Sequence, residues 1–422
     1  MLINKINNLN NAKVEILGSK SYTNRALIIA SLTEGKTILN NPLYSDDTKY
    51  MIESLEKLGV KFEKSDKKLI VYGNGGNFQV NKNTELFCGL AGTTSRFLTG
   101  LLALIQDDII INGEGKILER PIGDLVDGLR QIGVNIEYLG KEGSLPLKGN
   151  GKNINGNEIS INGGVSSQYF TALMMVAPLL QNGLKINVIG EQVSKSYIDI
   201  TCDIMKSFGV NVINNNYKEY IIKSTKYKAI EYNIEGDWSS ASYFCCLGAL
   251  IDGEIEISNL NNNSVQGDKH FAKLMEEVGA VVEYKNNSVI IKKDKIKPIN
   301  VNMELMPDTA MSLAVLLSFA NGKSRIDGLS TLKNKETDRL LAMKNELAKL
   351  SIETEIGDDY IVIYGGNHHK VIGEIETYND HRIAMSFAIA GAVLDGVVIK
   401  NTEVVSKSFP NFWECFNNLN KK

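Results

Sequence analysis

One pattern recurs six times along this 422-residue chain, at intervals of about 72 residues. In each copy, a cluster of polar or small residues stands directly before an apolar segment with helical periodicity. A short β-rich segment, a second amphipathic helix and a pair of alternating strands follow. The repeat predicts an α/β protein built from helix–strand–helix–strand–strand units. The six clusters begin at Ser21, Gly92, Ser166, Asp237, Asp308 and Asp380.

The sixth copy is incomplete, which constrains the domain organisation. Its second helix, at about 411–419, reaches the end of the sequence with no strand pair after it. Residues 2–6 and 13–17 alternate like a strand pair, so we expect residues 1–17 to complete this copy. The chain would then cross twice between two three-repeat domains.

These crossings predict the domain boundaries. The expected domains are residues 18–234 and a discontinuous domain of residues 1–17 plus 235–422, with a hinge near 17/18 and 234/235. The length of 422 residues suits two domains of about 200 residues, each with its own core.

The clusters predict anion binding, because the start of a helix presents free backbone N–H groups and a positive dipole end. Six such starts directed to one place would bind strongly anionic small molecules. For an individual cluster, an ordinary helix cap explains the same residues. The Asp residues 237, 308 and 380 all suit the N-cap position, and for Asp237 and Asp380 we keep that interpretation.

Composition excludes several classes of protein. A net charge of −3 gives no indication of a nucleic-acid or membrane surface, and no apolar run is long enough to span a bilayer. The first 20 residues lack the plan of a signal peptide. Five cysteines without metal-site spacing and four histidines predict reduced thiols in a cytoplasmic protein with no metal site.

Arginine is scarce in this chain, since only seven of the 46 basic residues are arginine. Where lysine is the usual cation, an arginine indicates a need for its planar, bidentate fork, which binds carboxylate or phosphate. Surface cations on turns are the alternative. Five arginines lie in repeat-opening or dense polar segments: Arg25, Arg96, Arg120, Arg339 and Arg382.

Two short segments combine several of these signals. Residues 18–25 place Gly18, two hydroxyl groups, Lys20 and Arg25 at a helix start, which suits either an anion cradle or a capped helix with a surface lysine. Residues 335–340 form the densest charge cluster. On a helix, Lys335 and Arg339 would lie four residues apart on one face, which is also typical of a solvated helix start.

Taken in order, the motifs resemble those of the enolpyruvyl transferases of the shikimate pathway, the EPSP synthase family. The resemblance spans the whole chain. It rests on Gly18-Ser19-Lys20-Ser21 with Asn24-Arg25, Ala91-Gly92-Thr93, residues 119–125, Ser166-Ser167-Gln168, residues 236–243, residues 307–311, residues 335–340, Asp380-His381-Arg382 and Lys407-Ser408-Phe409-Pro410.

The resemblance implies a fold of two domains, each with three βαβαββ repeats around a pseudo-threefold axis. It also implies transfer of the enolpyruvyl group of phosphoenolpyruvate to the 5-hydroxyl of shikimate 3-phosphate, with release of phosphate, in chorismate and aromatic amino acid biosynthesis. No cofactor, metal or macromolecular partner is implied, and a monomer is expected. Many cations would be needed, because each close pair of like charges costs about 4 kcal/mol at about 4 Å.

The resemblance also implies roles for individual residues. Asp308 would be the base on the 5-hydroxyl, and Glu336 the acid that protonates the methylene carbon of phosphoenolpyruvate. The implied contacts of shikimate 3-phosphate are Lys20, Ser21, Arg25, Ser166, Ser167, Gln168, Ser194, Asp308 and Lys335. The implied contacts of phosphoenolpyruvate are Lys20, Gly92, Arg120, Gln168, Arg339, Arg382 and Lys407. His381 would either orient Arg382 or contact a ligand.

Some positions depart from the family pattern. Leu17, Leu90, Phe97 and Thr331 stand where the family commonly has Pro, Asn, Pro and Asn. Two alternatives remain: the sister transferase that acts on UDP-N-acetylglucosamine, and a non-catalytic relative that binds anions or RNA ends. The sister enzyme would show a Lys-Asn pair where this chain has Lys20-Ser21.

Overall fold

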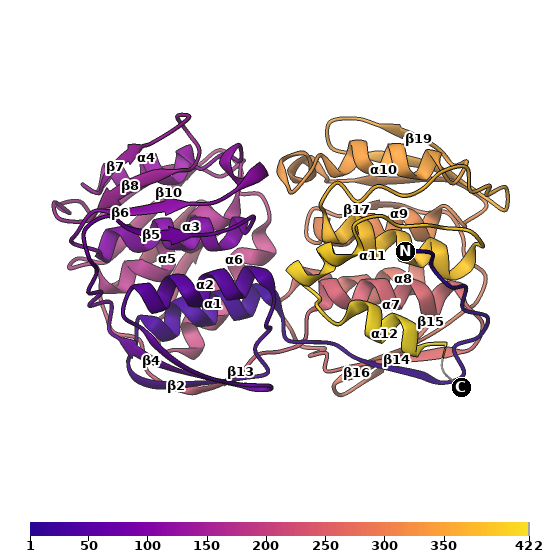
Figure 1. The fold of residues 1–422 in the computed structure, drawn as a ribbon, viewed down its shortest axis with the longest axis horizontal. Helices are drawn as coiled ribbons and strands as arrows, with labels where there is room; N and C mark the ends of the chain where they lie inside the picture. Colours follow the sequence, from indigo (N-terminus) through magenta and orange to yellow (C-terminus); the bar gives the residue numbers. More distant parts are fainter. Residues whose placement is uncertain (421–422) are drawn as a thin grey trace. The chain divides into compact units, whose positions relative to one another are not determined.

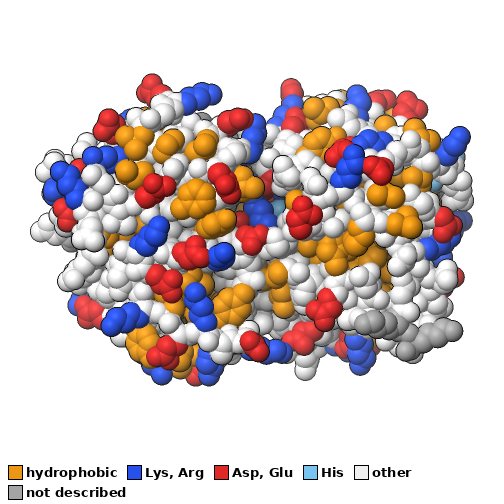
Figure 2. Space-filling view, in the orientation of Figure 1, with side chains coloured by type: hydrophobic (Ala, Val, Ile, Leu, Met, Phe, Trp, Pro, Cys, Tyr) orange, Lys and Arg blue, Asp and Glu red, His pale blue; other side chains and the backbone are white. Residues whose placement is uncertain are grey.

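The computed structural model describes residues 1–420, and the chain divides into two compact units. We call residues 18–234 the middle unit, and residues 1–17 with 235–422 the terminal unit. Each unit contains its own continuous cluster of buried apolar side chains. Basic and acidic side chains are interspersed over the face shown in Figure 2, in keeping with the small net charge.

The middle unit consists of three repeats, each with one four-stranded sheet and two helices. The sheets are β13-β2-β4-β3, β5-β6-β8-β7 and β11-β12-β10-β9. Figure 1 labels the strands β5, β6, β7 and β8 of the second sheet. The strands are β2 (Glu34–Asn40), β3 (Lys61–Ser65), β4 (Lys68–Asn74), β5 (Thr84–Phe87), β6 (Ile109–Asn112), β7 (Asn135–Tyr138), β8 (Leu147–Asn150), β9 (Glu158–Asn162), β10 (Leu184–Ile189), β11 (Val212–Asn215), β12 (Glu219–Ile222) and β13 (Glu231–Asn233). The helices are α1 (Lys20–Ser31), α2 (Asp46–Lys57), α3 (Gly92–Leu101), α4 (Gly123–Gln131), α5 (Ser167–Val176) and α6 (Lys195–Ser207).

The terminal unit repeats this plan, with sheets β1-β14-β16-β15 and β17-β18-β20-β19. The strands are β1 (Ala12–Glu15), β14 (Glu254–Ser258), β15 (Val281–Lys285), β16 (Ser288–Lys292), β17 (Asn300–Asn302), β18 (Gly322–Asp327), β19 (Glu353–Ile356) and β20 (Ile361–Gly365). The helices are α7 (Trp238–Leu250), α8 (His270–Val278), α9 (Ala310–Leu317), α10 (Arg339–Ala348), α11 (His381–Val393) and α12 (Phe412–Asn418). Short 3-10 helices include η4 (Gly267–Lys269), η5 (Pro307–Thr309), η6 (Ser330–Asn334) and η7 (Thr402–Lys407).

In the sixth repeat, the sheet is reduced to isolated β-bridges, whereas the helices α11 and α12 are present. Leu2 pairs antiparallel with Val398, and Ile375 pairs parallel with Ile399. The expectation that the N-terminus joins the sixth repeat is therefore confirmed at Leu2. The expected pairing of residues 2–6 with 13–17 is wrong, because β1 pairs in parallel with β14 of the fourth repeat.

The first strand of each sheet comes from the segment that precedes a helix start, which gives βαβαββ units. In β5-β6, β9-β10 and β17-β18, this strand belongs to its own repeat and pairs in parallel. At the two crossings the strands are exchanged. β1 leads into α1 of the middle unit but pairs with β14, whereas β13 leads into α7 of the terminal unit but pairs with β2.

Matching asparagines hold the chain at both crossings. In the middle unit, the amide of Asn41 donates to the carbonyl of Ile234 at 3.0 Å. In the terminal unit, the amide of Asn259 donates to the carbonyl of Ile16 at 2.7 Å. Each asparagine follows the second strand of its repeat in a left-handed conformation, with φ of 56° and 64°. Each unit therefore fixes one departing end of the chain.

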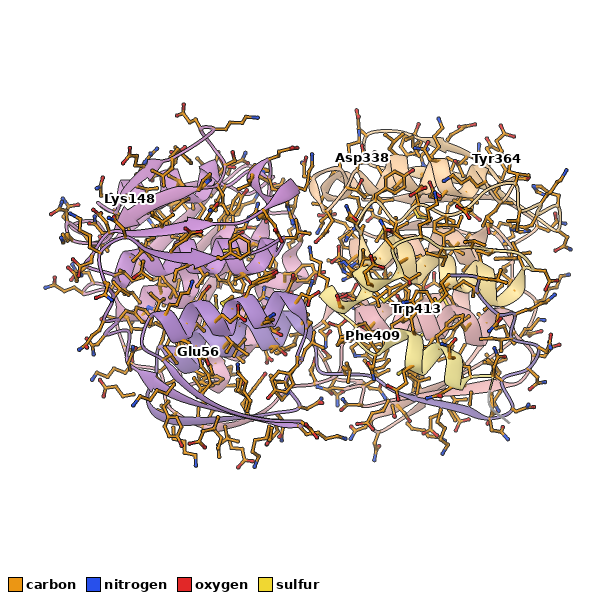
Figure 3. The ribbon with its side chains drawn as sticks, viewed as in Figure 1. Glu56, Lys148, Asp338, Tyr364, Phe409 and Trp413 are labelled. Atoms are coloured by element: carbon orange, nitrogen blue, oxygen red, sulfur yellow. The ribbon has the colours of Figure 1, made fainter. Side chains whose placement is uncertain are left out.

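The first helix of each repeat is apolar on nearly all sides, which requires burial within the unit. In the terminal unit, α7, α9 and α11 pack against one another, and all thirteen residues of α7 are buried. α12 packs onto α7 through an aromatic cluster, in which the ring of Phe412 lies 5.8 Å from Tyr243 and 5.9 Å from Phe244. Phe409 and Trp413, which Figure 3 labels, extend this cluster. Helix starts consequently carry the polar groups that the core excludes.

Candidate functional site

Three helix starts and the end of a 3-10 helix in the terminal unit bring five charged groups into one network. Asp308 lies in η5 at the start of α9, Glu336 lies just before α10, and Arg339 is the first residue of α10. Arg382 is the second residue of α11, and Lys407 ends η7. Hydrogen bonds and ion pairs of 2.8–3.1 Å join these residues into a single cluster.

Asp308 is surrounded by three cations. Its Oδ1 accepts from Arg339 Nη1 at 3.0 Å and lies 3.3 Å from Lys335 Nζ. Its Oδ2 accepts from Arg382 Nη2 at 3.1 Å. Burial alone would raise the pKa of Asp308, but Arg382, Lys335 and Arg339 outweigh it and hold the pKa well below its usual range. The carboxylate is therefore ionised, and it is a weak base while these contacts persist.

Arg339 is the centre of the network. Only 1% of this residue is exposed, and its Nε donates to Asp380 Oδ2 at 2.7 Å. Its Nη2 donates to Asp380 Oδ1 at 3.2 Å and to Glu336 Oε2 at 2.9 Å. Burial would lower the pKa of Arg339, but the carboxylates of Asp380, Glu336 and Asp308 raise it above its ordinary value. A permanently charged, fixed guanidinium results.

Glu336 is bonded to cations through both carboxylate oxygens. Oε2 accepts from Arg339, and Oε1 lies 2.8 Å from Lys407 Nζ. The prediction that Lys335 and Arg339 share one face of a helix is wrong, because α10 begins at Arg339 with Asp338 as its N-cap. Lys335 instead follows η6 in an extended conformation, from which it reaches Asp308.

A second layer of polar groups surrounds Arg382. Its Nη1 lies 3.4 Å from the hydroxyl of Tyr243, and its backbone N–H donates to Asp380 Oδ1 at 2.9 Å. The carboxyl of Asp268 accepts from the hydroxyl of Ser239 at 2.8 Å. Burial, reinforced by the charge of Asp308, raises the pKa of Asp268 to about 7.

In the middle unit, Lys20 and Ser21 open α1. The ammonium of Lys20 donates to Asp47 Oδ2 at 3.1 Å, and this carboxylate is almost fully buried. Asp47 stands near the start of α2 and also accepts, through its backbone carbonyl, from Thr94 Oγ1 at 3.0 Å. The pair therefore connects the starts of α1, α2 and α3.

Arg25, which the sequence predicts as a contact of shikimate 3-phosphate, is almost completely buried, with only 2% of the residue exposed. Its Nε donates to Thr201 Oγ1 at 2.9 Å, and its Nη1 donates to the carbonyl of Ser21 at 2.9 Å. Its Nη2 donates to the carbonyl of Tyr197 and to Thr171 Oγ1. These bonds engage four of the five guanidinium N–H groups. Burial lowers the pKa of Arg25 to about 10.

A glycine at the start of α3 leaves room for the guanidinium of Arg120. A Cβ atom at Gly92 would lie 2.5 Å from Arg120 Nη1, well inside contact distance. Arg96 fixes the same region by donating to the carbonyl of Gly92 at 3.2 Å and to that of Pro121 at 2.7 Å. The guanidinium of Arg120 is thus packed directly against a helix start, an arrangement suited to an anion.

The remaining predicted residues of the middle unit lie at the starts of α5 and α6. Ser166 is the N-cap of α5 and accepts from the backbone N–H of Gln168 at 3.2 Å. The side-chain amide of Gln168 donates to Thr93 Oγ1 at 3.2 Å, which links α5 to α3. Ser167 is buried at the first position of α5, and Ser194 is the buried N-cap of α6 in a left-handed conformation.

Comparison with known proteins identifies the family. A family model described as EPSP synthase (3-phosphoshikimate 1-carboxyvinyltransferase) matches residues 3–416. Proteins named 3-phosphoshikimate 1-carboxyvinyltransferase are similar over nearly their whole length. That of Colwellia psychrerythraea is 42% identical over 408 residues, with 96% of each chain covered. That of Shewanella amazonensis is 43% identical over 415 residues, with 97% of each chain covered.

The chain belongs to the EPSP synthase family. A solved structure of EPSP synthase from Acinetobacter baumannii has the same fold, with a TM-score of 0.82, 23% identity, and coverage of 99% of this chain and 97% of that chain. This confirms the predicted fold class, and the named relatives make the chain a transferase.

Sequence reasoning missed two buried carboxylates in this EPSP synthase family member. Asp47 gave no motif signal. Asp380 was interpreted as a cap only, and it does cap α11, but it also binds Arg339 through both oxygens. For Asp380 the scarcity of arginine was the available signal, because a buried guanidinium must be compensated by a carboxylate or by several hydrogen-bond acceptors.

Neither a metal site nor a membrane span is found where the structure is described. Among residues 1–420, no three His, Cys, Asp or Glu side chains are grouped to hold a metal ion. None of the helices in this range combines the length and apolar character of a bilayer-crossing segment. His381 is buried at the first position of α11, with Nδ1 3.7 Å from Asp380 Oδ1.

Proposed function

We propose that this chain transfers the enolpyruvyl group of phosphoenolpyruvate to the 5-hydroxyl of shikimate 3-phosphate and releases phosphate. The observation that carries the proposal is the network of Asp308 and Glu336 around Arg339, since it places two carboxylates among cations that can bind anionic reactants. The family's named members carry the corresponding activity in their names.

The basic residues supply the binding of both anions. In the terminal unit, Arg339, Arg382 and Lys407 bind phosphoenolpyruvate, and Lys335 binds shikimate 3-phosphate. In the middle unit, Lys20 and Gln168 serve both ligands. The other assignments in this unit are Gly92 and Arg120 for phosphoenolpyruvate, and Ser21, Arg25, Ser166, Ser167 and Ser194 for shikimate 3-phosphate. Arg25 donates its remaining N–H, since four are already engaged.

Asp308 and Glu336 carry the proton transfers. The 5-hydroxyl oxygen bonds to C2 of phosphoenolpyruvate while Asp308 takes the hydroxyl proton. Glu336 takes up a proton when the ligand displaces Arg339 and Lys407 from its carboxylate, and it delivers this proton to the methylene carbon. The product of this addition is a tetrahedral adduct. In the second step, the carboxylate of Glu336 takes a proton back from the methyl group while the bond from C2 to the phosphate oxygen breaks. The proton on Asp308 passes to the departing phosphate, so the double bond is restored and both residues return to their starting forms.

Substrate binding makes Asp308 a better base. In the structure, the cations that would bind phosphoenolpyruvate are paired with Asp308 and Glu336. When the carboxylate and phosphate of the ligand take over these cations, the charge that depresses the pKa of Asp308 is partly neutralised. Its pKa then rises towards a value suited to proton abstraction.

We further propose a reducing, cytoplasmic location and a monomeric state. All five cysteines are free, and burial raises the pKa of Cys88 and Cys245 to about 12, which makes both thiols inert. Size-exclusion chromatography with light scattering tests the monomer.

Phosphate release tests the proposed reaction. The purified protein is supplied with phosphoenolpyruvate together with shikimate 3-phosphate, with either compound alone, and with phosphoenolpyruvate together with UDP-N-acetylglucosamine. We expect phosphate only from the first mixture. Release with the nucleotide sugar would assign the sister activity, and no release from any mixture would refute enolpyruvyl transfer. Asp308→Ala and Glu336→Ala should each abolish release while phosphoshikimate binding persists.

A further inference from the structure

Helix α10 is tied at two points to the segment that leads into α11. At the first point, Arg339 donates to both carboxylate oxygens of Asp380. At the second, Glu346 accepts from the backbone N–H of Glu376 at 2.9 Å and from the hydroxyl of Tyr378 at 2.7 Å. Positions 339 and 346 are two turns apart and therefore share one face of the helix.

The buried carboxylate of Glu346 has a specific role in positioning the neighbouring loop. The residue is 0% exposed, and its Oε2 also lies 2.8 Å from Lys349 Nζ. Burial of a carboxylate is unfavourable unless hydrogen bonds compensate for lost water, and an apolar side chain of similar volume would avoid that cost. Two of its three bonds go to loop 376–380, so the carboxylate specifies the position of this loop.

The loop itself is held in an unfavourable conformation. Tyr378 and Asn379 have φ of 54° and 55°, in the left-handed region that a bulky residue such as Tyr rarely adopts. The backbone N–H of Asp380 then donates to the carbonyl of Thr377 at 2.8 Å, which closes the turn. This turn places Asp380 at the start of α11, where its carboxylate meets Arg339.

We propose that Glu346 and Tyr378 are positioning residues for enolpyruvyl transfer: they hold loop 376–380 and, through Asp380, fix the guanidinium of Arg339 for the carboxylate of phosphoenolpyruvate. The inference rests on the proposed function, because it takes Arg339 as a phosphoenolpyruvate contact. Tyr378 is 37% exposed, so its ring contributes little to the core and its hydroxyl can be removed without leaving a cavity.

A double-mutant cycle tests whether Tyr378 acts through Arg339. Tyr378→Phe removes only the hydroxyl, and Arg339→Lys removes the fork that binds Asp380. We expect Tyr378→Phe to lower kcat/KM for phosphoenolpyruvate about fivefold, the usual effect of one hydrogen bond. In the Arg339→Lys background the same change should alter kcat/KM by less than about twofold, since coupled residues are not additive. Glu346→Gln, which preserves volume, should show the same dependence.

The chain offers a matched control in the same unit. The hydroxyl of Tyr364 on β20 donates to Glu355 Oε1 on β19 at 2.6 Å, and Tyr364 is labelled in Figure 3. Tyr364→Phe therefore breaks a Tyr–Glu bond of the same kind outside loop 376–380. It should leave kcat/KM unchanged in both backgrounds.

The outcomes separate the inference from the function on which it rests. If Tyr378→Phe lowers kcat/KM by the same factor in both backgrounds, its effect does not pass through Arg339 and the inference is overturned. It is also overturned if Tyr378→Phe and Glu346→Gln both leave kcat/KM unchanged. If the wild-type protein does not turn over at all, the proposed function itself fails.

Discussion

Replacing Asp380 by Asn tests how much of the terminal unit's stability depends on the buried partner of Arg339. Asp380 is fully buried and accepts three hydrogen bonds, two from Arg339 and one from the backbone N–H of Arg382. Asn keeps the shape and can still cap α11 through its oxygen. It loses the negative charge, and its NH₂ group must face a donor of Arg339.

The expected loss follows from the environment of Arg339. Removing one partner of a buried ion pair costs about 3–5 kcal/mol, and we take the lower end because Asp308 and Glu336 still contact this guanidinium. For a unit of this size, each kcal/mol lowers the melting temperature by about 2–4 °C. Asp380→Asn should therefore lower the melting temperature of the terminal unit by about 6–12 °C.

Differential scanning calorimetry of the full chain measures this shift. The matched control is Asp338→Asn, at the N-cap of α10 directly before Arg339 (Figure 3). Asp338 is partly exposed and accepts only from the backbone N–H of Leu341 at 3.1 Å among its described hydrogen bonds, a bond that Asn preserves. Equal melting temperatures for the two variants would show that Asp308 and Glu336 alone compensate Arg339, and the reasoning would be refuted.

Three further predictions concern pH and packing. The pKa of Asp308 is depressed in the native state, so its contribution to the free energy of unfolding is present above the unfolded pKa of about 4 and is lost as pH falls. In urea denaturation, the difference in the free energy of unfolding between wild type and Asp308→Asn should therefore narrow below about pH 4. The pKa of Asp268 is raised to about 7 in the native state, so ionisation of this carboxyl destabilises the fold as pH rises. In the same assay, the free energy of unfolding of Asp268→Asn should increase relative to that of wild type by up to about 4 kcal/mol between pH 4 and pH 8. Gly92→Ala should displace Arg120 and raise the KM for phosphoenolpyruvate about 10-fold, with little change in melting temperature because a flexible side chain can move.

Local signals in the sequence predicted most helices and strands of the repeats. The second helix of a repeat ends where the chain turns left-handed, at Gly279 with φ of 112° in the fourth repeat. Ser351 takes the same place in the fifth repeat with φ of 61°, although it lacks the freedom of glycine. Such signals act within a few residues, and for that reason they can be recognised from sequence alone.

Local sequence signals could not predict which strand pairs with the N-terminal strand β1. Residues 2–6 and 13–17 have the alternation of a strand pair, but alternation reports only that a face is buried. β1 has an alternative partner, β14, about 240 residues away in the sequence, and it takes that partner in the same parallel arrangement that β5, β9 and β17 have in their repeats. The symmetry of the repeats carried this information, whereas local periodicity did not.

The charged segment of residues 335–340 shows a second limit of prediction from sequence. Counting residues as if a helix ran through 335–340 paired Lys335 with Arg339, but Asp338 accepts from the backbone N–H of Leu341 and starts α10 at Arg339. Lys335 and Arg339 nevertheless converge, because both reach Asp308 from different directions. Spacing along the sequence therefore identified two residues that meet at Asp308, but it predicted the wrong geometry for them.

Asp380 shows why one partner of Arg339 was missed. As an N-cap it needs one carboxylate oxygen, and that explanation accounted for its position completely. The structure shows that Oδ1 caps α11 and also accepts from Arg339, while Oδ2 accepts from Arg339 at 2.7 Å. A carboxylate can satisfy a backbone N–H and a guanidinium at once, so a sufficient local role does not exclude a second one.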